Sequence, residues 1–196
     1  IPFKATSGSL WLYLKKATVA DHGTETGWDA AYADQVLING RLSIFSAYTS
    51  VDGVTGSENS GHGIKVQIMG TAYADNIGIF VAVSLSYITV THVEIQGPGE
   101  MVLYDTRGLY SASNTAVSDH TYSYLYIHDL SNNCLTLNRH IGNILIEHCR
   151  LERSKTGVVS LHAQAIQFSN PPASGVVIRY NNIIDCAGTA AIALLG

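Results

Sequence analysis

The sequence predicts an all-β protein, a right-handed single-stranded parallel β-helix (solenoid) of about five to seven coils. Three observations predict it: a short phrase that recurs, the alternation of residues inside the phrase, and the irregular interval between its copies. The clearest copies are residues 124–130, 143–149 and 175–181, with the sequences YLYIHDL, NILIEHC and GVVIRYN. Looser copies occupy residues 48–54 and 87–93.

The alternation inside each copy has the period of a β-strand, whereas an amphipathic helix would repeat its apolar residues every three to four positions. The central apolar residues are Val51, Val90, Ile127, Ile146 and Ile178, so successive intervals are 39, 37, 19 and 32 residues. A constant strand with variable spacing indicates a solenoid coil with loops of different length at its corners. Left-handed β-helices keep a stricter step, which favours the right-handed form.

A second short strand is expected after each phrase, and the inward positions of both strands should form stacked columns about 4.8 Å apart. The second strands are expected at residues 63–66, 101–104, 134–137, 165–168 and 191–194. One inward column contains Val54, Val93, Leu130, Cys149 and Asn181. Because Asn181 is the only polar member, we expect its side chain to bond the backbone of a corner.

The whole chain, residues 1–196, is expected to form a single β-helix domain. Residues 48–196 hold the regular coils with loop insertions, and residues 1–47 hold irregular N-terminal coils with strands near residues 1–5, 12–17 and 36–40. Solenoids need polar caps on their terminal coils. No cap is visible at the C-terminal end, so we expect the sequence to be a portion of a longer β-helix.

The composition limits the partners that the protein can have. Charged residues make up 13% of the chain, about half of the usual quarter, and a polar, uncharged surface of this kind suggests an extracellular or cell-surface protein. A net charge of −4 argues against a nucleic-acid partner. The sequence has no run of 18 apolar residues, so no membrane span is expected.

The three cysteines, Cys134, Cys149 and Cys186, are an odd number and fall at different strand positions. We expect free and mostly buried thiols, since sequence spacing alone does not establish the close approach that a disulfide requires. Their spacing matches no zinc site. No cofactor and no metal are expected.

The segment DHGTETGW at residues 21–28, followed by YTSVDGVTG at residues 48–56, resembles the opening coils of bacterial secreted right-handed β-helix proteins of the pectate-lyase-like superfamily. The resemblance covers most of the chain at the level of the coil pattern. It implies the fold and no particular reaction, because functional sites are grafted onto folds.

Two enzyme families on this fold provide a comparison. SGHGIK at residues 60–65 is similar to the Gly-His-Gly element of polygalacturonases, but that family's paired aspartates and Asn-Thr-Asp element are absent. Calcium-dependent pectate lyases gather acidic residues on one sheet. The expected outward positions of the second strands are nearly neutral here, so a calcium site of that type is not expected.

Two outward columns leave room for chemistry. The first contains Asp52, Thr91, His128, Glu147 and Arg179, and the second, at the adjacent corner, contains Gly53, His92, Asp129, His148 and Tyr180. The candidate catalytic residues are His128, Asp129, Glu147, His148 and Arg179. A base and a cation suit β-elimination from a uronate, and Asp129 with Glu147 is the one carboxyl pair for hydrolysis. The alternative is that these residues form ordinary cross-strand polar pairs.

The candidate ligand-binding residues are Tyr180, His162, His92 and Trp28. Tyrosine and tryptophan offer flat apolar faces with polar tips, which suit stacking on sugars. His162 is expected at the edge of a groove between the insertions at residues 55–61 and 152–161.

The function predicted from the sequence is that of a secreted or cell-surface protein that binds or processes polysaccharide, such as a cell-surface glycan, along its lateral face. The alternative is a non-enzymatic structural or adhesive rod, or a filament subunit, that associates with itself end to end through uncapped coils. A tailspike-like glycan depolymerase is a third possibility.

Overall fold

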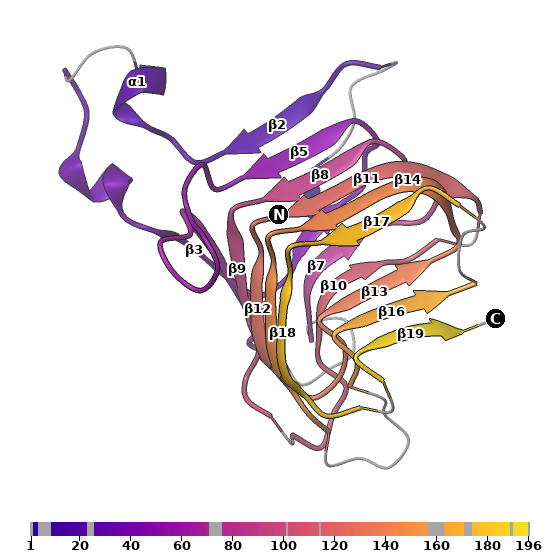
Figure 1. Cartoon of the computed structure of the whole chain (residues 1–196). Coiled ribbons are helices and arrows are strands. Elements are labelled where there is room, and N and C mark those ends of the chain that lie inside the picture. The colour runs from indigo at the N-terminus through magenta and orange to yellow at the C-terminus, as the bar shows by residue number, and fades with distance from the viewer. Residues whose placement is uncertain are drawn as a thin grey trace.

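Three parallel sheets form the walls of the molecule (Figure 1). The computed structural model describes residues 2–3, 9–22, 26–70, 76–100, 102–113, 115–156, 163–170, 174–188 and 190–195. Sheet A contains β1 (Pro2–Phe3), β4 (Leu42–Ile44), β7 (Ile77–Val81), β10 (Arg107–Ser111), β13 (Leu135–Asn138), β16 (Ile166–Ser169) and β19 (Ile192–Leu195). Sheet B contains β2 (Leu12–Lys15), β5 (Thr49–Asp52), β8 (Ile88–Thr91), β11 (Val117–Ser123), β14 (His140–Glu147) and β17 (Val176–Arg179). Sheet C contains β3 (Val36–Asn39), β6 (Ile64–Gln67), β9 (Val93–Gln96), β12 (Tyr126–Leu130), β15 (Arg150–Ser154) and β18 (Asn182–Cys186).

Each turn of the chain adds one strand to sheet B, one to sheet C and one to sheet A. Coil 1 is β2, β3 and β4, and the pattern repeats until coil 6, which is β17, β18 and β19. Neighbouring strands within the three sheets pair in parallel, and β1 adds one further short strand beside β4. The predicted fold class, a right-handed parallel β-helix, is therefore confirmed, with about six coils.

The core includes three stacked columns, one from the middle of each sheet, and further buried residues beside them. The inward column of sheet B is Leu14, Val51, Val90, Tyr122, Ile146 and Ile178. The column of sheet C is Ile38, Val66, Ile95, Ile127, Leu151 and Ile183. The column of sheet A is Leu42, Ile79, Leu109, Leu135, Ile166 and Ile192. Branched side chains of similar size fit this stacking because each one packs against its copy in the next coil.

The register of coil 4 differs from the sequence prediction. The prediction placed Ile127 in the column of Val90 and Ile146, but the residue paired with both is Tyr122. Ile127 lies in sheet C, where it pairs with Ile95 and Leu151. The physical reason is that β11 carries His120 and Tyr122 at positions that are fully buried, so the strand does not show the aliphatic alternation of its neighbours.

Each coil has three strands where the sequence pattern showed two. The second strand of coil 3 is β9, and the described residues 102–104 of the expected strand at residues 101–104 are not in a strand. Strands β8 and β9 are separated by His92 alone, so the two strands are read as one continuous run.

The turn from sheet B to sheet C is made by one residue with a left-handed backbone. His92, Tyr124, His148 and Tyr180 occupy this position in coils 3 to 6, with φ between 51° and 55°. None of them is a glycine, although a left-handed conformation costs a residue with a side chain roughly 1–2 kcal/mol. Such residues persist where their surroundings fix them, and here their rings contact one another.

The prediction for Asn181 is confirmed. Its Oδ1 accepts a hydrogen bond from the backbone N–H of Cys149 at 2.9 Å, and its Nδ2 donates to the carbonyl of Ile146 at 2.9 Å. The amide side chain thus satisfies both backbone groups of the corner below it. Cys149 itself belongs to the buried core, as expected.

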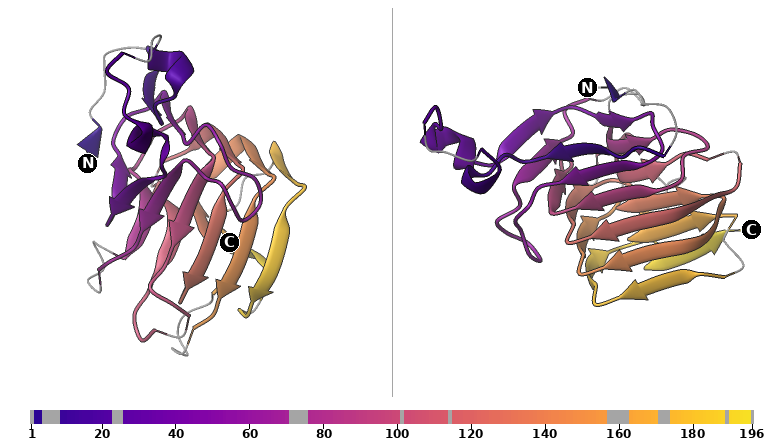
Figure 2. Two further views of the ribbon diagram at one scale, coloured as in Figure 1. Left: turned by 90° about the vertical axis from the view of Figure 1, so that its left-hand side faces the viewer. Right: turned by 90° about the horizontal axis from the view of Figure 1, so that it is seen from above.

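The N-terminal third builds coil 1 and a long insertion. The expected strands near residues 12–17 and 36–40 are present as β2 and β3, and the expected strand near residues 1–5 includes β1. Between β2 and β3 the chain forms α1 (Val19–His22) and η1 (Ala30–Ala33), which stand beside the stacked strands (Figure 2). None of the helices in the described ranges is long and apolar enough to cross a membrane.

Candidate functional site

A ladder of four rings runs along the corner between sheets B and C. It consists of His92, Tyr124, His148 and Tyr180, which we call the ring ladder. Successive ring centroids are 4.9, 4.9 and 5.1 Å apart, and the planes are tilted by 13°, 4° and 23°. This spacing matches the distance between neighbouring strands, so the rings lie face to face along the coil axis. Their polar edges, the phenol hydroxyls and imidazole nitrogens, are left at the sides of the stack.

A hollow of about 190 Å³ lies against the ring ladder. Its lining residues are Ser57, Glu58, Tyr124, His148, Cys149, Tyr180 and Asn182. Ser57 and Glu58 come from the loop at residues 53–63, which connects β5 to β6 in coil 2, while Tyr180 and Asn182 belong to coil 6. The loop therefore extends along the corner, and we call the space between it and the ring ladder the corner groove.

The loop is held in place by His62, which is only 2% exposed. Its Nε2 lies 3.1 Å from the carbonyl oxygen of Tyr124, and its ring stacks on Tyr126 with centroids 6.2 Å apart. Burial lowers the pKa of His62, and nearby Glu94 only partly opposes this shift. The Gly-His-Gly segment thus places a buried histidine that anchors a loop, and not a histidine open to a ligand.

The edge of the corner groove carries an ion pair. Arg179 and Glu147 are partners in register on β17 and β14, and Arg179 Nε lies 2.8 Å from Glu147 Oε2. The guanidinium also lies 5.5 Å from the centre of the Tyr180 ring. Of the predicted catalytic residues, the structure therefore brings Glu147, His148 and Arg179 together beside Tyr180.

His128 and Asp129 do not belong to this group, which corrects the predicted patch. His128 lies on β12 of sheet C, where it pairs in register with Glu152 on β15 of coil 5. Glu147 lies on β14 of the same coil, which belongs to sheet B. The error follows from the shifted register of coil 4: in the column of Glu147 the true member is Ser123, and in the ring ladder it is Tyr124. Asp129 and Glu147 therefore do not form a carboxyl pair for hydrolysis.

The outward face of sheet C holds His128 and Asp129 in a network of alternating charges, which we call the sheet C network. Its members are Lys65, Glu94, Tyr126, His128, Asp129, Arg150, Glu152 and Arg153. The nitrogens of His128 lie 3.3 Å from Glu94 Oε1 and 2.6 Å from Asp129 Oδ2. Lys65 lies 2.6 Å from Glu94, and Arg153 Nε lies 2.5 Å from Asp129 Oδ1.

The remaining members surround Glu152, which is 2% exposed. The Tyr126 hydroxyl donates a hydrogen bond of 2.7 Å to Glu152, and both Arg150 and Arg153 form ion pairs with its carboxylate. Every carboxylate of the network therefore faces at least one cation, as buried charges require.

The pKa values of the acids show the same balance. Burial by itself would raise the pKa of Glu94, but hydrogen bonds from His128, Lys65 and Gln35 outweigh it and lower the pKa to about 2. For Asp129 burial is likewise opposed by Arg153 and His128, and the pKa is lowered. Acids with lowered pKa values remain ionised near neutrality, so neither is suited to donate a proton.

This charged face was not predicted from the sequence, because the repeat indicated two strands per coil where there are three. The outward residues Glu94, Arg150 and Glu152 alternate with the core residues of β9 and β15, and this alternation was the available signal. The expectation that one sheet is nearly neutral holds for Thr136, Gln167 and Ala193 of sheet A. The expectation of a nearly neutral face is wrong for sheet C, to which Lys65 belongs.

Two of the four predicted ligand-binding residues, His92 and Tyr180, lie in the ring ladder. The Nδ1 of His92 is 2.9 Å from Asp52 Oδ1. Tyr180 ends the ring ladder and is 70% exposed. Trp28 lies in the insertion between β2 and β3, outside the corner groove. His162 falls outside the described residues.

Two further observations concern metals and thiols. Within the ranges that the structure describes, no group of three or more His, Cys, Asp or Glu side chains is placed to hold a metal ion. Cys134, Cys149 and Cys186 are free, the first two buried and the third half-buried.

The fold defines the class of the molecule, a right-handed parallel β-helix with a ring ladder and groove along one corner. Comparison with models of protein families, with curated proteins and with solved structures finds no match for this chain.

Proposed function

We propose that this protein binds an extended glycan chain in the corner groove. The observation that carries the proposal is the hollow of about 190 Å³ between the loop and the ring ladder. Its lining combines two phenols, an imidazole, an amide and the carboxylate of Glu58. Carbohydrates are recognised by such hydrogen-bonding groups set among aromatic carbons.

The spacing of the ring ladder supports an extended ligand. Polar ring edges recur every 4.9 to 5.1 Å along the corner, which is close to the length of one pyranose unit in an extended chain. Successive sugars would then meet chemically similar edges. Tyr180, at the end of the ladder, is exposed and suits stacking on a sugar face.

Binding without catalysis is the form of the proposal that the contacts favour. Hydrolysis requires two carboxyl groups on either side of the scissile bond, and Asp129 lies on a different face from Glu147. The Glu147 carboxylate is paired with Arg179. The alternative is an elimination reaction with His148 as the base and Arg179 as the cation. The test below distinguishes this reaction from binding alone.

The proposal also covers the cellular location of the protein and its relation to a known superfamily. We place the protein outside the cell or at the cell surface, because its surface carries few charges. Kinship with the pectate-lyase-like superfamily is proposed from the pattern of coils.

The test is a binding screen on a panel of soluble neutral and uronate-containing polysaccharides, followed by titration calorimetry of the best ligand. We expect Tyr180→Ala and His148→Ala to weaken binding at least tenfold. Tyr13→Ala is the matched control, since Tyr13 is 68% exposed and lies on coil 1 outside the corner groove. Equal affinity of Tyr180→Ala and the intact protein would overturn the proposal, as would the absence of any glycan ligand. Appearance of an unsaturated-uronate absorbance would convert it from binding to elimination.

A second candidate, end-to-end association between copies, is favoured by one observation. Coil 6 exposes several apolar side chains: Val177 at 45%, Ile184 at 41%, Ile192 at 39%, Leu194 at 66% and Leu195 at 43%. Strands without a neighbour also present unpaired backbone groups. Sedimentation velocity over a concentration series should show assemblies that Leu194→Glu abolishes. Leu103→Glu, at a site 80% exposed and outside coil 6, should leave them intact, and a monomer at every concentration would exclude this candidate.

A further inference from the structure

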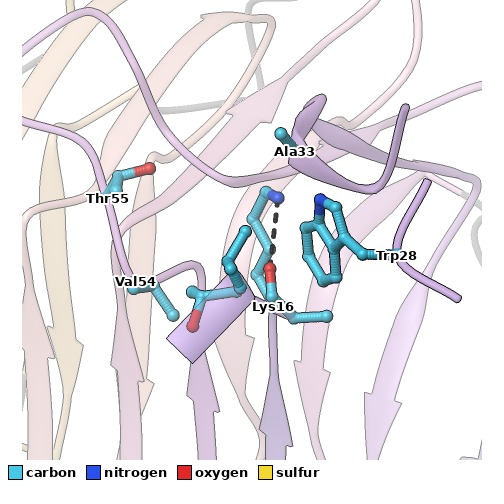
Figure 3. A pocket seen from close by; sticks show the side chains of 8 residues that line it. Lys16, Trp28, Ala33, Val54 and Thr55 are labelled. Atoms are coloured by element: carbon cyan, nitrogen blue, oxygen red, sulfur yellow. Dashed lines mark hydrogen bonds between the residues drawn. The ribbon is translucent and has the colours of Figure 1, made fainter. Parts of the chain in front are cut away.

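A second hollow lies at the other end of the B–C corner, under the insertion between β2 and β3 (Figure 3). Its volume is about 200 Å³, and its lining residues are Lys16, Ala17, Thr18, Val19, Trp28, Ala33, Val54 and Thr55. Two parts of the chain form it, the insertion that follows β2 and the corner that follows β5. Trp28 was predicted from the sequence to bind a ligand, and it does not line the corner groove.

Among the described residues that line this hollow, Lys16 is the one with a charged group, and it is just 8% exposed. Its Nζ donates to the carbonyl of Tyr32 at 2.8 Å and reaches that of Ala17 at 3.5 Å. Both acceptors are neutral. In the part of the chain that the structure describes, Lys16 makes no ion pair, whereas its neighbour Lys15 pairs with Asp21 at 2.9 Å. A lysine this well buried is uncommon unless it is paired.

The position of the Lys16 stem is fixed by the backbone of coil 2. A Cβ added to Gly63 would lie 2.5 Å from Lys16 Cδ, so the absence of a side chain at Gly63 makes the space through which the stem passes. On the other side the Lys16 side chain lies beside the Trp28 ring (Figure 3). Trp28 is itself held by edge contacts, with ring centroids 5.5 Å from Tyr32 and 5.7 Å from His22.

These features define the chemistry of a ligand. The buried ammonium favours a negative charge, and Trp28, Val19, Val54 and Ala33 provide apolar surface. The hydroxyls of Thr18 and Thr55 donate to Asp21 and to the Gly61 carbonyl, so they do not add donors for an anion. A single cation without further donors suits a monoanionic carboxylate better than a phosphate, which requires several.

The volume sets the size of the ligand. An engineered apolar cavity of about 150 Å³ accommodates benzene, so about 200 Å³ suits one six-membered ring with a short substituent. We propose that this hollow is a binding site for a small carboxylic acid that carries one ring, with its carboxylate on Lys16 Nζ and its ring against Trp28. The site is separate from the corner groove, and it stands or falls independently of glycan binding.

The test uses benzoate as the probe and benzyl alcohol as its neutral counterpart. Binding of each to the intact chain is monitored by NMR through the indole N–H resonance of Trp28. Trp11→Phe assigns that resonance, because the chain contains two tryptophans. We expect benzoate to shift the Trp28 signal saturably and benzyl alcohol to bind at least tenfold more weakly. Lys16→Met, which keeps the length of the stem, should weaken benzoate binding at least tenfold. Lys15→Met should not.

A second variant keeps the test decisive if Lys16→Met does not fold. Ala33→Leu fills the hollow and leaves Lys16 in place, and it should also remove benzoate binding. Equal affinity for benzoate and benzyl alcohol, undiminished binding by a folded Lys16→Met or Ala33→Leu, or no shift of Trp28 at millimolar benzoate would each overturn the proposal.

Discussion

The imidazoles of His120 and His140 meet inside the coil, with His120 Nδ1 3.1 Å from His140 Nε2. Neither residue is more than 1% exposed. His120 also contacts the Tyr122 hydroxyl at 2.7 Å and the Leu85 carbonyl at 2.8 Å. His140 is bonded through Nδ1 to the carbonyl of Asn138 at 3.1 Å. The interior of the solenoid therefore holds a buried polar cluster in coils 4 and 5.

This pair should make the protein sensitive to acid. Burial lowers the pKa of His120 to about 4 and, with the neighbouring His120, that of His140 to about 3, from an ordinary value of 6.5. The hydrogen bond to the Leu85 carbonyl and the charge of Asp119 both raise the pKa of His120, but burial outweighs them. Because the folded state binds these protons less tightly than the unfolded state, stability is full above pH 6.5 and falls as the pH drops towards 4. Each pKa unit corresponds to about 1.4 kcal/mol, so we expect a loss of a few kcal/mol.

Urea unfolding measured between pH 7.5 and 4.5 tests this prediction. A variant with His120→Gln and His140→Gln should lose most of the dependence that the histidines cause, even if it is less stable at pH 7.5. His22→Gln, on the exposed helix α1, is the matched control and should retain it. A rise in stability on acidification would contradict the prediction, and would mean that one proton is held between the two facing nitrogens.

Asn181→Ala should destabilise the protein by about 1–3 kcal/mol, because the backbone N–H of Cys149 and the carbonyl of Ile146 lose their partner inside a corner. The free energy of unfolding in urea measures the change. Asn182→Ala, one residue further along and exposed, is the control and should cost less than about 0.5 kcal/mol. Similar costs for the two variants would show that Asn181 does not cap the corner.

Gly97→Ala should be among the most damaging small substitutions in this chain. An added Cβ would lie 2.0 Å from the carbonyl oxygen of Asp129 and 2.7 Å from Leu130 Cδ2. The first obstacle is backbone of the next coil, so relief requires the two coils to separate, at a cost of about 3 kcal/mol or more. At Gly142 the nearest atom would be the Ser174 carbonyl oxygen at 3.4 Å, and Gly142→Ala should fold normally. Thermal unfolding followed by circular dichroism distinguishes the two outcomes.

The sheet C network should be strongly coupled, unlike the ion pair at the corner groove. A double-mutant cycle of Asp129→Asn and Arg153→Met should give an interaction energy of about 1–3 kcal/mol, because the pair shares His128 and Glu152. The matching cycle of Glu147→Gln and Arg179→Met should give less than about 1 kcal/mol, since the Arg179 side chain is 52% exposed. Equal values in the two cycles would contradict the coupling through His128 and Glu152 on which this prediction rests.

The solenoid and much of its core could be predicted from sequence because the inward residues are regular. Val51, Val90, Ile146 and Ile178 do form one column, as expected. Coil 4 was misplaced by one sheet because Tyr122 fills an aliphatic position and is buried through contact with His120. Local alternation carries no information about a polar cluster that is satisfied only by residues from other coils.

Part of the candidate site could also be predicted, because the corner positions recur as regularly as the inward ones. His92, His148 and Tyr180 were expected in one corner column and lie in one ring ladder. The fourth ring, Tyr124, was replaced in the prediction by Asp129 through the shift of coil 4. The other wall of the corner groove could not be foreseen. The course of the loop at residues 53–63 depends on the contact between His62 and Tyr124, which are 62 residues apart in the sequence.

That loop also has a mechanical consequence. In an ordinary solenoid each coil touches only its neighbours, so a pull on one end peels the coils away one after another. Here His62 leaves coil 2 and is bonded to Tyr124 in coil 4, which ties coils across the intervening coil 3. Traction from the N-terminal side must break this tie and withdraw a buried ring before coil 2 can separate. Coils 2 to 4 should therefore resist stretching as a single block.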